Sequence, residues 1–221
     1  DAAHYWLSLG IDGYRLDHVI GPSHDFWQHF SASLKRDFPH AVLFGEAWGK
    51  GLSAKHFKTI RIRNKWIRKL SGISQEKLQL EYYGELDGVL DFSLNEILIN
   101  SVKHGVKPNE KRIQKKINRH FKNIPQDYTM VTFLDNHDMD RFLRHCNGDT
   151  DLLLSTFELL LSLDQPVVIY YGTENGMWNQ TPVTIFEHHS DLAVREPFDR
   201  ENINEDLFNN FRDLITKYRS K

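Results

Sequence analysis

Short apolar strands alternate with amphipathic helices along the chain, and this alternation is the strongest constraint on its fold. The strand patterns cover residues 13–19, 41–44, 88–92, 128–134 and 166–171. Helical spacing of apolar residues marks 2–9, 25–38, 52–82, 94–102, 109–121, 152–163 and 205–219. Strands that alternate with helices form parallel βαβ units. The sequence therefore predicts an α/β fold, which is either an open doubly wound sheet or part of a (β/α)₈ TIM barrel.

Five strand–helix units are present, whereas a closed barrel needs eight strands and typically about 250 residues. The 221 residues therefore fit a partial barrel, its second half from strand four to strand eight. The chain begins Asp1-Ala2-Ala3-His4 inside a helical pattern, so we expect the natural N-terminus to precede it. Without that terminus the cellular compartment is not predicted.

Charge and composition narrow the classes of partner. The net charge is −2, 26% of residues are charged, and no apolar run is long enough to span a bilayer. We therefore expect neither nucleic acid nor membrane as a partner. The basic stretch 55–69 interleaves its cations with Phe57, Ile60 and Trp66, which is typical of the solvated face of a packed helix. The single Cys146 excludes an internal disulfide, and its polar neighbours predict a free loop thiol.

Charged side chains stand at the carboxyl ends of four of the predicted strands, where parallel α/β folds place their sites, and Glu174 is the one after the fifth strand. Arg15 and Asp17 end the first strand, two residues apart and on one face. Glu46 ends the second strand, and His137 and Asp138 follow the fourth. A charge that points into a barrel costs on the order of several kcal/mol unless it is partnered. Convergence of these groups therefore predicts a site.

Two carboxyl groups with different pKa values are the requirement of glycoside hydrolysis. Arg15 is placed to keep Asp17 ionised, while the apolar surroundings of Glu46, with Trp48 close by, predict a raised pKa. Asp138 is then a third acid, which is expected to accept hydrogen bonds from sugar hydroxyls.

Each of these features taken alone also has a simpler interpretation. Asp17 and Arg15 form an ordinary ion pair, Glu46 ends a strand without further role, and the triplet 136–138 caps a helix or orders a loop. A metal bound by the His137–Asp138 pair lacks a second ligand at a suitable spacing.

The motifs, in their order along the chain, resemble those of the α-amylase family of retaining glycoside hydrolases. Residues 10–17 (GIDGYRLD), 44–48 (FGEAW) and 133–138 (FLDNHD) resemble its strand-four, strand-five and strand-seven motifs. Residues 88–92, 165–174 and 195–198 are similar to its strand six, its strand eight and the segment before its last helix. The resemblance implies that residues 1–221 are the C-terminal portion of the catalytic barrel. The first strands and the domain inserted after strand three are then missing.

The resemblance also implies a role for each motif residue. Asp17 is expected as nucleophile, Glu46 as general acid/base and Asp138 as transition-state stabiliser, with Arg15, His137, His18 and Trp48 as sugar contacts. For His18 a loop or supporting role is the alternative. The expected substrates are α-glucans or malto-oligosaccharides, cleaved or transferred. A structural calcium is an option for the longer enzyme only, and no metal is assigned to this chain.

Classical members carry a Lys-His pair where this chain has Ile20 and Gly21. This departure leaves the leaving-group contacts and the calcium-binding carbonyl open. Two other hypotheses also stay open. A non-catalytic homologue would keep the barrel and lose the acids, yet all three acids stand at motif positions here. An unrelated doubly wound domain would bind a small ligand at its strand ends. The oligomeric state is not predicted.

Overall fold

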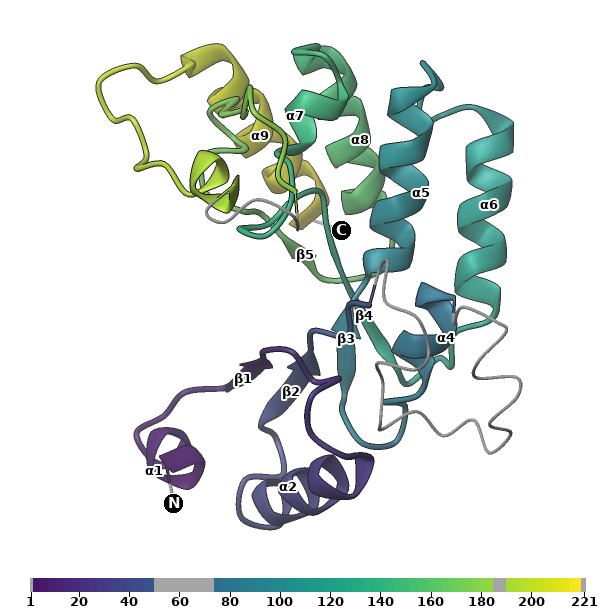
Figure 1. The fold of residues 1–221 in the computed structure, drawn as a ribbon, viewed down its shortest axis with the longest axis vertical. Helices are drawn as coiled ribbons and strands as arrows, with labels where there is room; N and C mark the ends of the chain where they lie inside the picture. Colours follow the sequence, from purple (N-terminus) through teal and green to yellow (C-terminus); the bar gives the residue numbers. More distant parts are fainter. Residues whose placement is uncertain (1, 50–73, 185–189, 220–221) are drawn as a thin grey trace. The chain divides into compact units, whose positions relative to one another are not determined.

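The structure is a computed structural model that describes residues 2–49, 74–184 and 190–219 (Figure 1). Its strands are β1 (Gly13–Leu16), β2 (Val42–Gly45), β3 (Gly88–Leu90), β4 (Thr129–Phe133) and β5 (Val167–Val168). Its helices are α1 (Ala2–Ser8), α2 (His24–Asp37), α4 (Gln75–Leu80), α5 (Phe92–Lys103), α6 (Lys111–Lys122), α7 (Phe142–His145), α8 (Thr150–Ser162), the 3₁₀ helix η2 (Ser190–Val194) and α9 (Glu205–Arg219). Most of the predicted helix 52–82, including the basic stretch 55–69, lies outside the described residues.

Every strand pairs in parallel with the next one along the chain, in the order β1-β2-β3-β4-β5. Helices intervene between consecutive strands, as parallel pairing requires. The predicted α/β alternation is therefore confirmed. The chain divides into two compact units: unit 1 comprises residues 1–93 and 124–131, and unit 2 comprises residues 94–123 and 132–221. Strand β4 belongs to unit 1 up to Val131 and to unit 2 from Thr132.

Unit 1 is built on β1, β2, β3 and the first part of β4, with α2 packed through its apolar face. Trp27 and Leu34 are the buried apolar residues of α2, and Leu43 is the fully buried centre of β2. Lys35 reaches from α2 to Asp87, its Nζ lying 2.7 Å from Oδ2. The same Asp87 oxygen accepts the backbone N–H of Leu43 at 2.7 Å. One carboxylate thus joins the helix to two adjacent strands at their amino ends.

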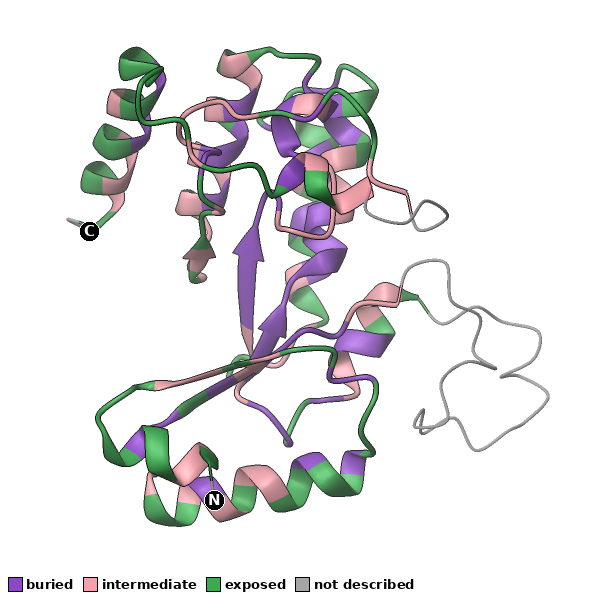
Figure 2. Ribbon diagram, turned by 60° about the vertical axis from the view of Figure 1, so that its left-hand side comes forward, coloured by how far each residue is buried: buried purple, intermediate pink, exposed green. Residues whose placement is uncertain are grey.

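Unit 2 has its own apolar core, formed by α5, α6, α7, α8 and α9 (Figure 1). Leu98, Ile117, Phe157 and Phe211 are each at most 1% exposed, and the rings of Phe157 and Phe211 stack with centroids 4.3 Å apart. Burial of side chains of this size stabilises a fold by about 1.5–3 kcal/mol each. Figure 2 shows the end of β4 buried as well. Residues that follow β4, such as Phe142, and residues of α9, which follows β5, are part of this core.

Cys146 is a free thiol in the turn that follows α7, as the sequence predicted. It is nevertheless only 4% exposed and belongs to the apolar core of unit 2. Burial raises the pKa of the thiol to about 12. Its polar neighbours in the sequence gave no sign of this burial.

Four of the five strands are shorter than predicted, β1 and β5 most of all. The chain leaves β1 after Leu16 because His18 adopts a positive φ of 46° and the N–H of Gly21 then turns back to the carbonyl of His18. Strand β5 pairs with β4 only at Val167 and Val168, where the sequence predicted 166–171. After β5 the apolar pattern continues beyond the last paired residue.

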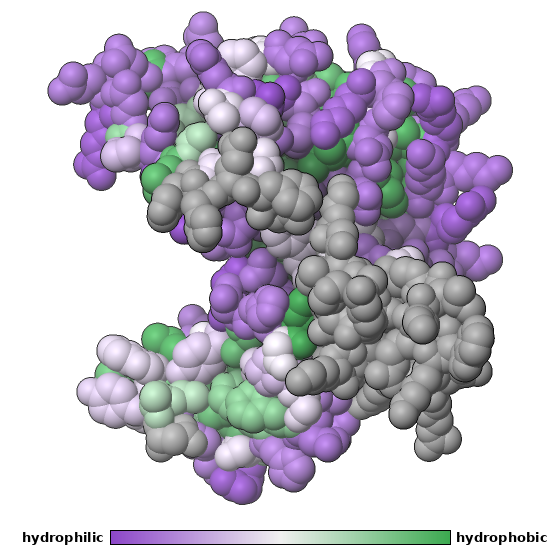
Figure 3. Space-filling view, viewed as in Figure 1, coloured by the Kyte–Doolittle hydropathy of each residue, from purple (hydrophilic) through white to green (hydrophobic). Residues whose placement is uncertain are grey.

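Some apolar side chains remain on the surface of unit 1. Trp6, Leu9 and Val42 are 52%, 60% and 49% exposed. White to green surface appears in Figure 3 over the part of unit 1 where Figure 1 places α1, β2 and α2. Among the described helices, none combines the length and the apolar character needed to cross a membrane.

Candidate active site

The parallel register of β1 and β2 brings two carboxyl groups to neighbouring positions in unit 1. Leu16 pairs with Gly45, so Asp17 and Glu46 are each the first residue after a paired position. The ladder continues one step further, because the N–H of Glu46 donates to the carbonyl of Leu16 at 2.8 Å. The carbonyl of Glu46 in turn accepts the N–H of Val19 at 3.1 Å. The pairing of β1 with β2 therefore extends to the backbone of Glu46 and to the turn that follows Asp17.

Arg15 bridges the two carboxylates. Its Nη2 lies 2.8 Å from Oε2 of Glu46, and its Nη1 donates to Oδ1 of Asp17. The two acids differ in exposure: the side chain of Asp17 is 71% exposed, whereas that of Glu46 is only 7% exposed. One guanidinium is thus shared by an open carboxylate and a buried one.

Burial raises the pKa of the Glu46 carboxyl above its ordinary value, as the sequence predicted. The positive charge of Arg15 works against this shift, and the adjacent Asp17 adds to it. The N–H of His18, 3.4 Å from Oε2, also favours the ionised form. The balance leaves Glu46 more readily protonated than an exposed glutamic acid, which suits a proton donor.

Glycine at position 45 is required by packing directly before Glu46. A Cβ added there would lie 2.7 Å from Cδ1 of Leu86 and 2.9 Å from Cγ1 of Val19. Val19 is fixed in turn, because its carbonyl accepts both the indole N–H of Trp27 at 2.8 Å and the hydroxyl of Tyr82 at 3.0 Å. The backbone on either side of the two acids is therefore closely held.

His18 and Trp48 were predicted as sugar contacts from the same region. His18 is exposed in the left-handed backbone region, and its described contact with the site is the backbone N–H to Glu46. Trp48 is half-buried and stacks on Phe92, with ring centroids 5.1 Å apart and planes 5° apart. Stacking on Phe92 takes up one face of the indole.

His137 and Asp138 form a second cluster, in unit 2. Oδ2 of Asp138 lies 3.2 Å from Nε2 of His137. Its Oδ1 accepts Nη2 of Arg195 at 2.7 Å, and its backbone N–H donates to the side chain of Asn136 at 2.9 Å. His137 and Asp138 are 40% and 30% exposed at their side chains, so the cluster faces solvent.

A buried acid supports the turn that follows this cluster. Asp135 is 2% exposed, and its carboxylate accepts the N–H of Phe142 and the hydroxyl of Thr173, each at 2.7 Å. Burial raises the pKa of Asp135, and these two hydrogen bonds oppose the shift. Asp135 stands in the motif 133–138 but was not singled out from the sequence, although its position directly after Phe133 and Leu134 in a largely apolar strand is a usable signal of burial.

The structure thus brings Arg15, Asp17 and Glu46 together in unit 1, and His137 and Asp138 together in unit 2. Arg195, the partner of Asp138, stood in the matching segment 195–198 but was given no role in the site. Asp191 lies four residues before Arg195, a spacing that lets them pair on one turn, and their side chains are 2.8 Å apart.

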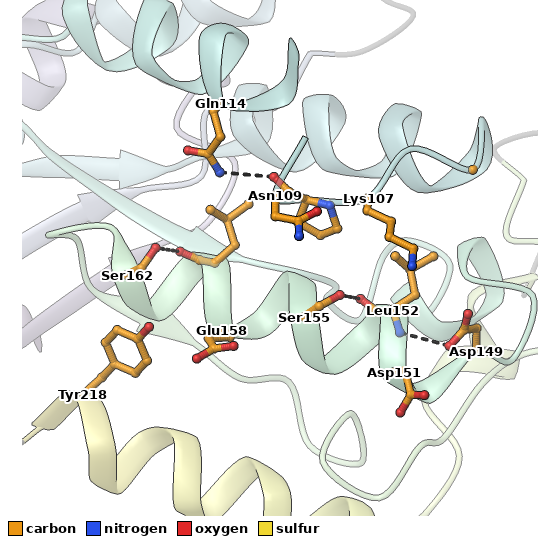
Figure 4. Close-up of a pocket in the computed structure, with 13 residues that line it drawn as sticks. Lys107, Asn109, Gln114, Asp149, Asp151, Leu152, Ser155, Glu158, Ser162 and Tyr218 are labelled. Carbon is orange, nitrogen blue, oxygen red and sulfur yellow. Dashed lines mark hydrogen bonds between the residues drawn. The ribbon is translucent and has the colours of Figure 1, made fainter. Parts of the chain in front are cut away.

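A cavity of about 670 Å³ lies elsewhere, in unit 2, along the outer face of α8 (Figure 4). Ser155 and Ser162 line it, with Asn109 and Gln114 opposite and Tyr218 at one end. None of its lining residues carries a predicted role, and both serine hydroxyls donate to their own helix.

The described part of the chain holds no group of three or more His, Cys, Asp or Glu side chains arranged to bind a metal ion. The structural calcium considered from the sequence therefore stays a prediction for the longer enzyme.

Comparison with known proteins places these observations in a family. The family model described as "Alpha amylase, catalytic domain" matches residues 1–215. Alpha-amylase 2 of Dictyoglomus thermophilum is 29% identical over 221 positions, covering 97% of this chain and 34% of the relative. Neopullulanase 2 of Thermoactinomyces vulgaris is 26% identical over 220 positions, covering 97% of this chain and 31% of the relative. The chain thus spans about a third of the length of these relatives.

Two solved structures share the fold of this chain. An alpha-amylase from Geobacillus thermoleovorans, complexed with acarbose, is 21% identical with a TM-score of 0.75, covering 100% of this chain and 43% of that chain. The cyclic alpha-maltosyl-(1→6)-maltose hydrolase from Arthrobacter globiformis, in complex with that cyclic sugar, is 22% identical with a TM-score of 0.74, covering 100% and 43%. These likenesses confirm the predicted fold class, a partial TIM barrel. With the family model matching nearly all of its length, the chain belongs to the alpha-amylase catalytic-domain family of glycoside hydrolases.

Proposed function

We propose that the protein carrying this chain is a retaining glycosidase that cleaves or transfers α-glucosidic bonds in α-glucans or malto-oligosaccharides. Asp17 is the nucleophile and Glu46 the general acid/base. The observation that carries the proposal is the pair of carboxylates on one guanidinium, one open and one buried with a raised pKa. Retaining glycosidases need this division of labour between two closely spaced acids.

In the first step an Oδ of Asp17 attacks the anomeric carbon, and the bond from that carbon to the leaving oxygen breaks. The leaving oxygen takes the proton of Glu46, so a glycosyl ester forms on Asp17 and Glu46 becomes a carboxylate. Arg15 supports both states, because its guanidinium contacts each carboxylate. The open position of Asp17 leaves its carboxylate accessible to substrate.

In the second step a water, or a sugar hydroxyl in transfer, gives its proton to Glu46 and attacks the anomeric carbon. The bond to Asp17 breaks, and two inversions give net retention. Asp138 is the transition-state stabiliser, and it grips sugar hydroxyls together with His137. Arg15, His18 and Trp48 complete the proposed sugar contacts.

We further propose that residues 1–221 correspond to strands four to eight of the catalytic barrel. The order of the motifs and the coverage of about a third of each relative support this. Names of relatives, which include a cyclomaltodextrinase and a neopullulanase, support α-linked glucose oligomers as the substrate class.

The test uses the whole protein that carries this sequence, with an unactivated glucan and an aryl α-maltoside as substrates. For the unactivated glucan we expect Asp17→Asn and Glu46→Gln each to lower kcat/KM at least about a thousandfold, the scale set by general acid–base and covalent catalysis. Asp12→Asn and Glu201→Gln, isosteric changes at exposed positions, are the matched controls and should leave the rate unchanged.

Leaving-group dependence separates the two roles. A substrate whose leaving group needs no proton should regain most of its first-step rate with Glu46→Gln and none with Asp17→Asn. Azide should then give the α-glycosyl azide with a Glu46→Ala variant. Wild-type turnover by both Asp17→Asn and Glu46→Gln would refute the assignment, and an inactive wild type that still binds maltotriose would favour a non-catalytic homologue.

A further inference from the structure

Arg195 touches the predicted stabilising pair at two points. Its Nη2 lies 2.7 Å from Oδ1 of Asp138, and its Nε donates to the carbonyl of His137 at 2.9 Å. The same Nη2 lies 2.8 Å from Asp191, one turn earlier. One guanidinium therefore holds the side chain of Asp138 and the backbone immediately before it.

The backbone on both sides of Arg195 is itself fixed. The carbonyl of Val194 accepts Nη2 of Arg141 at 2.9 Å and the hydroxyl of Tyr170 at 3.1 Å. The carbonyl of Glu196 accepts the hydroxyl of Tyr171 at 2.7 Å. The segment that carries Arg195 is thus fastened at the residue before it and at the residue after it.

Arg141 contributes to these contacts from a buried position. It is 1% exposed, and its guanidinium stacks over the ring of Tyr170 with 4.1 Å to the centroid. Its Nη1 also donates to the carbonyl of Tyr171 at 2.6 Å. A buried arginine with its donors on two separate loops holds those loops in one arrangement. The loop after β5 and the segment around η2 therefore present Arg195 to Asp138 in a defined position.

We propose that Arg195 is a positioning residue of the reaction, which holds the Asp138 carboxylate in the orientation needed to accept sugar hydroxyls. The inference rests on the proposed function, in which Asp138 stabilises the transition state. Both oxygens of Asp138 are oriented, Oδ1 by Arg195 and Oδ2 by His137. A free aspartate at this exposure would rotate about χ1 and χ2, and substrate binding would have to select one rotamer.

The planar fork of an arginine is essential to this role. Nε and Nη2 point in directions fixed by the guanidinium, so one side chain reaches the His137 carbonyl and the Asp138 carboxylate at once. A lysine offers a single charged centre and satisfies one of the two contacts. A lysine at position 195, which keeps the charge but not the planar guanidinium, should therefore support only part of the wild-type activity.

The test compares Arg195→Ala, Arg195→Lys and Arg195→Gln in the whole protein with an aryl α-maltoside. Misplacement of a catalytic group by a fraction of an ångström to 1 Å costs up to about a hundredfold in rate, so we expect Arg195→Ala to lower kcat about tenfold to a hundredfold. KM should change less than about threefold, since a transition-state interaction is lost. Arg195→Lys should fall between wild type and Arg195→Ala.

Arg212→Ala is the matched control, because Arg212 pairs only loosely with the exposed Asp213, at 3.6 Å, and lies in the same unit. Its kcat should equal that of wild type. Guanidinium ion added to Arg195→Ala should restore part of kcat and should not affect Arg212→Ala. A merely structural arginine would not respond to this addition.

A double-mutant cycle closes the test. Arg195→Ala placed in an Asp138→Asn background should cost less than threefold, because Arg195 acts through Asp138. Full additivity of the two changes, or a rise in KM at constant kcat, would overturn the positioning role. If instead Asp17→Asn and Glu46→Gln retain wild-type turnover, the proposed function fails first. Loss of activity in those two variants with an unaffected Arg195→Ala removes only this inference.

Discussion

The two clusters of predicted site residues are stabilised in different ways. In unit 1 the acids directly follow paired strand residues, and one of them is buried with a raised pKa. In unit 2 Asp138 lies five residues beyond the end of β4 and is partly exposed. Its carboxylate is held by Arg195, which is distant along the chain. The first cluster is built by strand register and the second by loops tied to each other. The geometry of the first cluster should therefore survive substitutions in loops, whereas the geometry of the second cluster should change when residues outside the cluster are substituted.

Arg15→Met gives the largest effect expected from a single change around the carboxylates, because one guanidinium serves both acids. We expect kcat/KM to fall about a hundredfold to a thousandfold, more than for Arg195→Ala. Removal of the charge that lowers the pKa of Glu46 should also move the alkaline limb of the residual pH–rate profile to higher pH. A larger loss in Arg195→Ala would break the comparison between the clusters.

Arg141→Met tests the ties in unit 2. The methionine fills much of the space but removes the Arg141 donor from the Tyr171 carbonyl and one of the two donors from the Val194 carbonyl. A buried polar group that loses its partner costs about 1–3 kcal/mol. The denaturant concentration at the unfolding midpoint should be lower than in wild type. The kcat of Arg141→Met should fall by about as much as the kcat of Arg195→Ala. The pKa of Glu46, read from the pH–rate profile, should stay unchanged. A shifted profile would mean that the clusters are not supported separately.

Gly45→Ala tests the corresponding packing in unit 1. The added methyl would overlap Leu86 and Val19, and overpacking of this kind costs about 1–3 kcal/mol. Because residue 45 immediately precedes Glu46, we expect a several-fold loss of kcat as well. Thermal unfolding and steady-state rates measure the two effects. Gly84→Ala is an informative contrast: an added Cβ there would meet no atom within 4 Å, so any effect must come from its positive φ of 81°.

The pH dependence of stability gives the smallest effect. The folded pKa of Glu46 is raised above its ordinary value of 4.5, so its contribution to stability is present below that pH and is lost as the pH rises through the folded pKa. Glu46→Gln cannot ionise and does not lose it. The melting temperature of the variant relative to wild type should therefore rise by a few degrees from pH 4 to pH 8. A constant or falling difference would contradict a buried carboxyl with a raised pKa.

Local sequence patterns predicted what depends on local structure. The last helix occupies 205–219 as predicted, because its apolar spacing, its acidic first turn and its basic last turn agree. The contact of Arg15 with Asp17 also follows from strand geometry. The strand ends were predicted less well, since apolar residues continue beyond the ladder in β5 and the positive φ of His18 turns the chain out of β1.

Long-range contacts could not be predicted in this way. Arg195 is 57 residues from Asp138 along the chain, and no periodicity links them. The burial of Arg141 is equally invisible in its own neighbourhood, because it is due to carbonyls and rings from the loop after β5 and from η2. The burial of Cys146 could not be predicted for the same reason: its neighbours in sequence are polar, while its neighbours in space are apolar.

The hydrogen bond from Trp27 to the carbonyl of Val19 provides an optical probe of the site. The indole is 5% exposed and is bonded to the backbone two residues after Asp17. Displacement of that loop would break or lengthen the bond and change the polarity around the indole, to which its emission responds. The part of the fluorescence change on sugar binding that Trp27→Phe removes would report displacement of this loop in real time, without a label near the reacting groups.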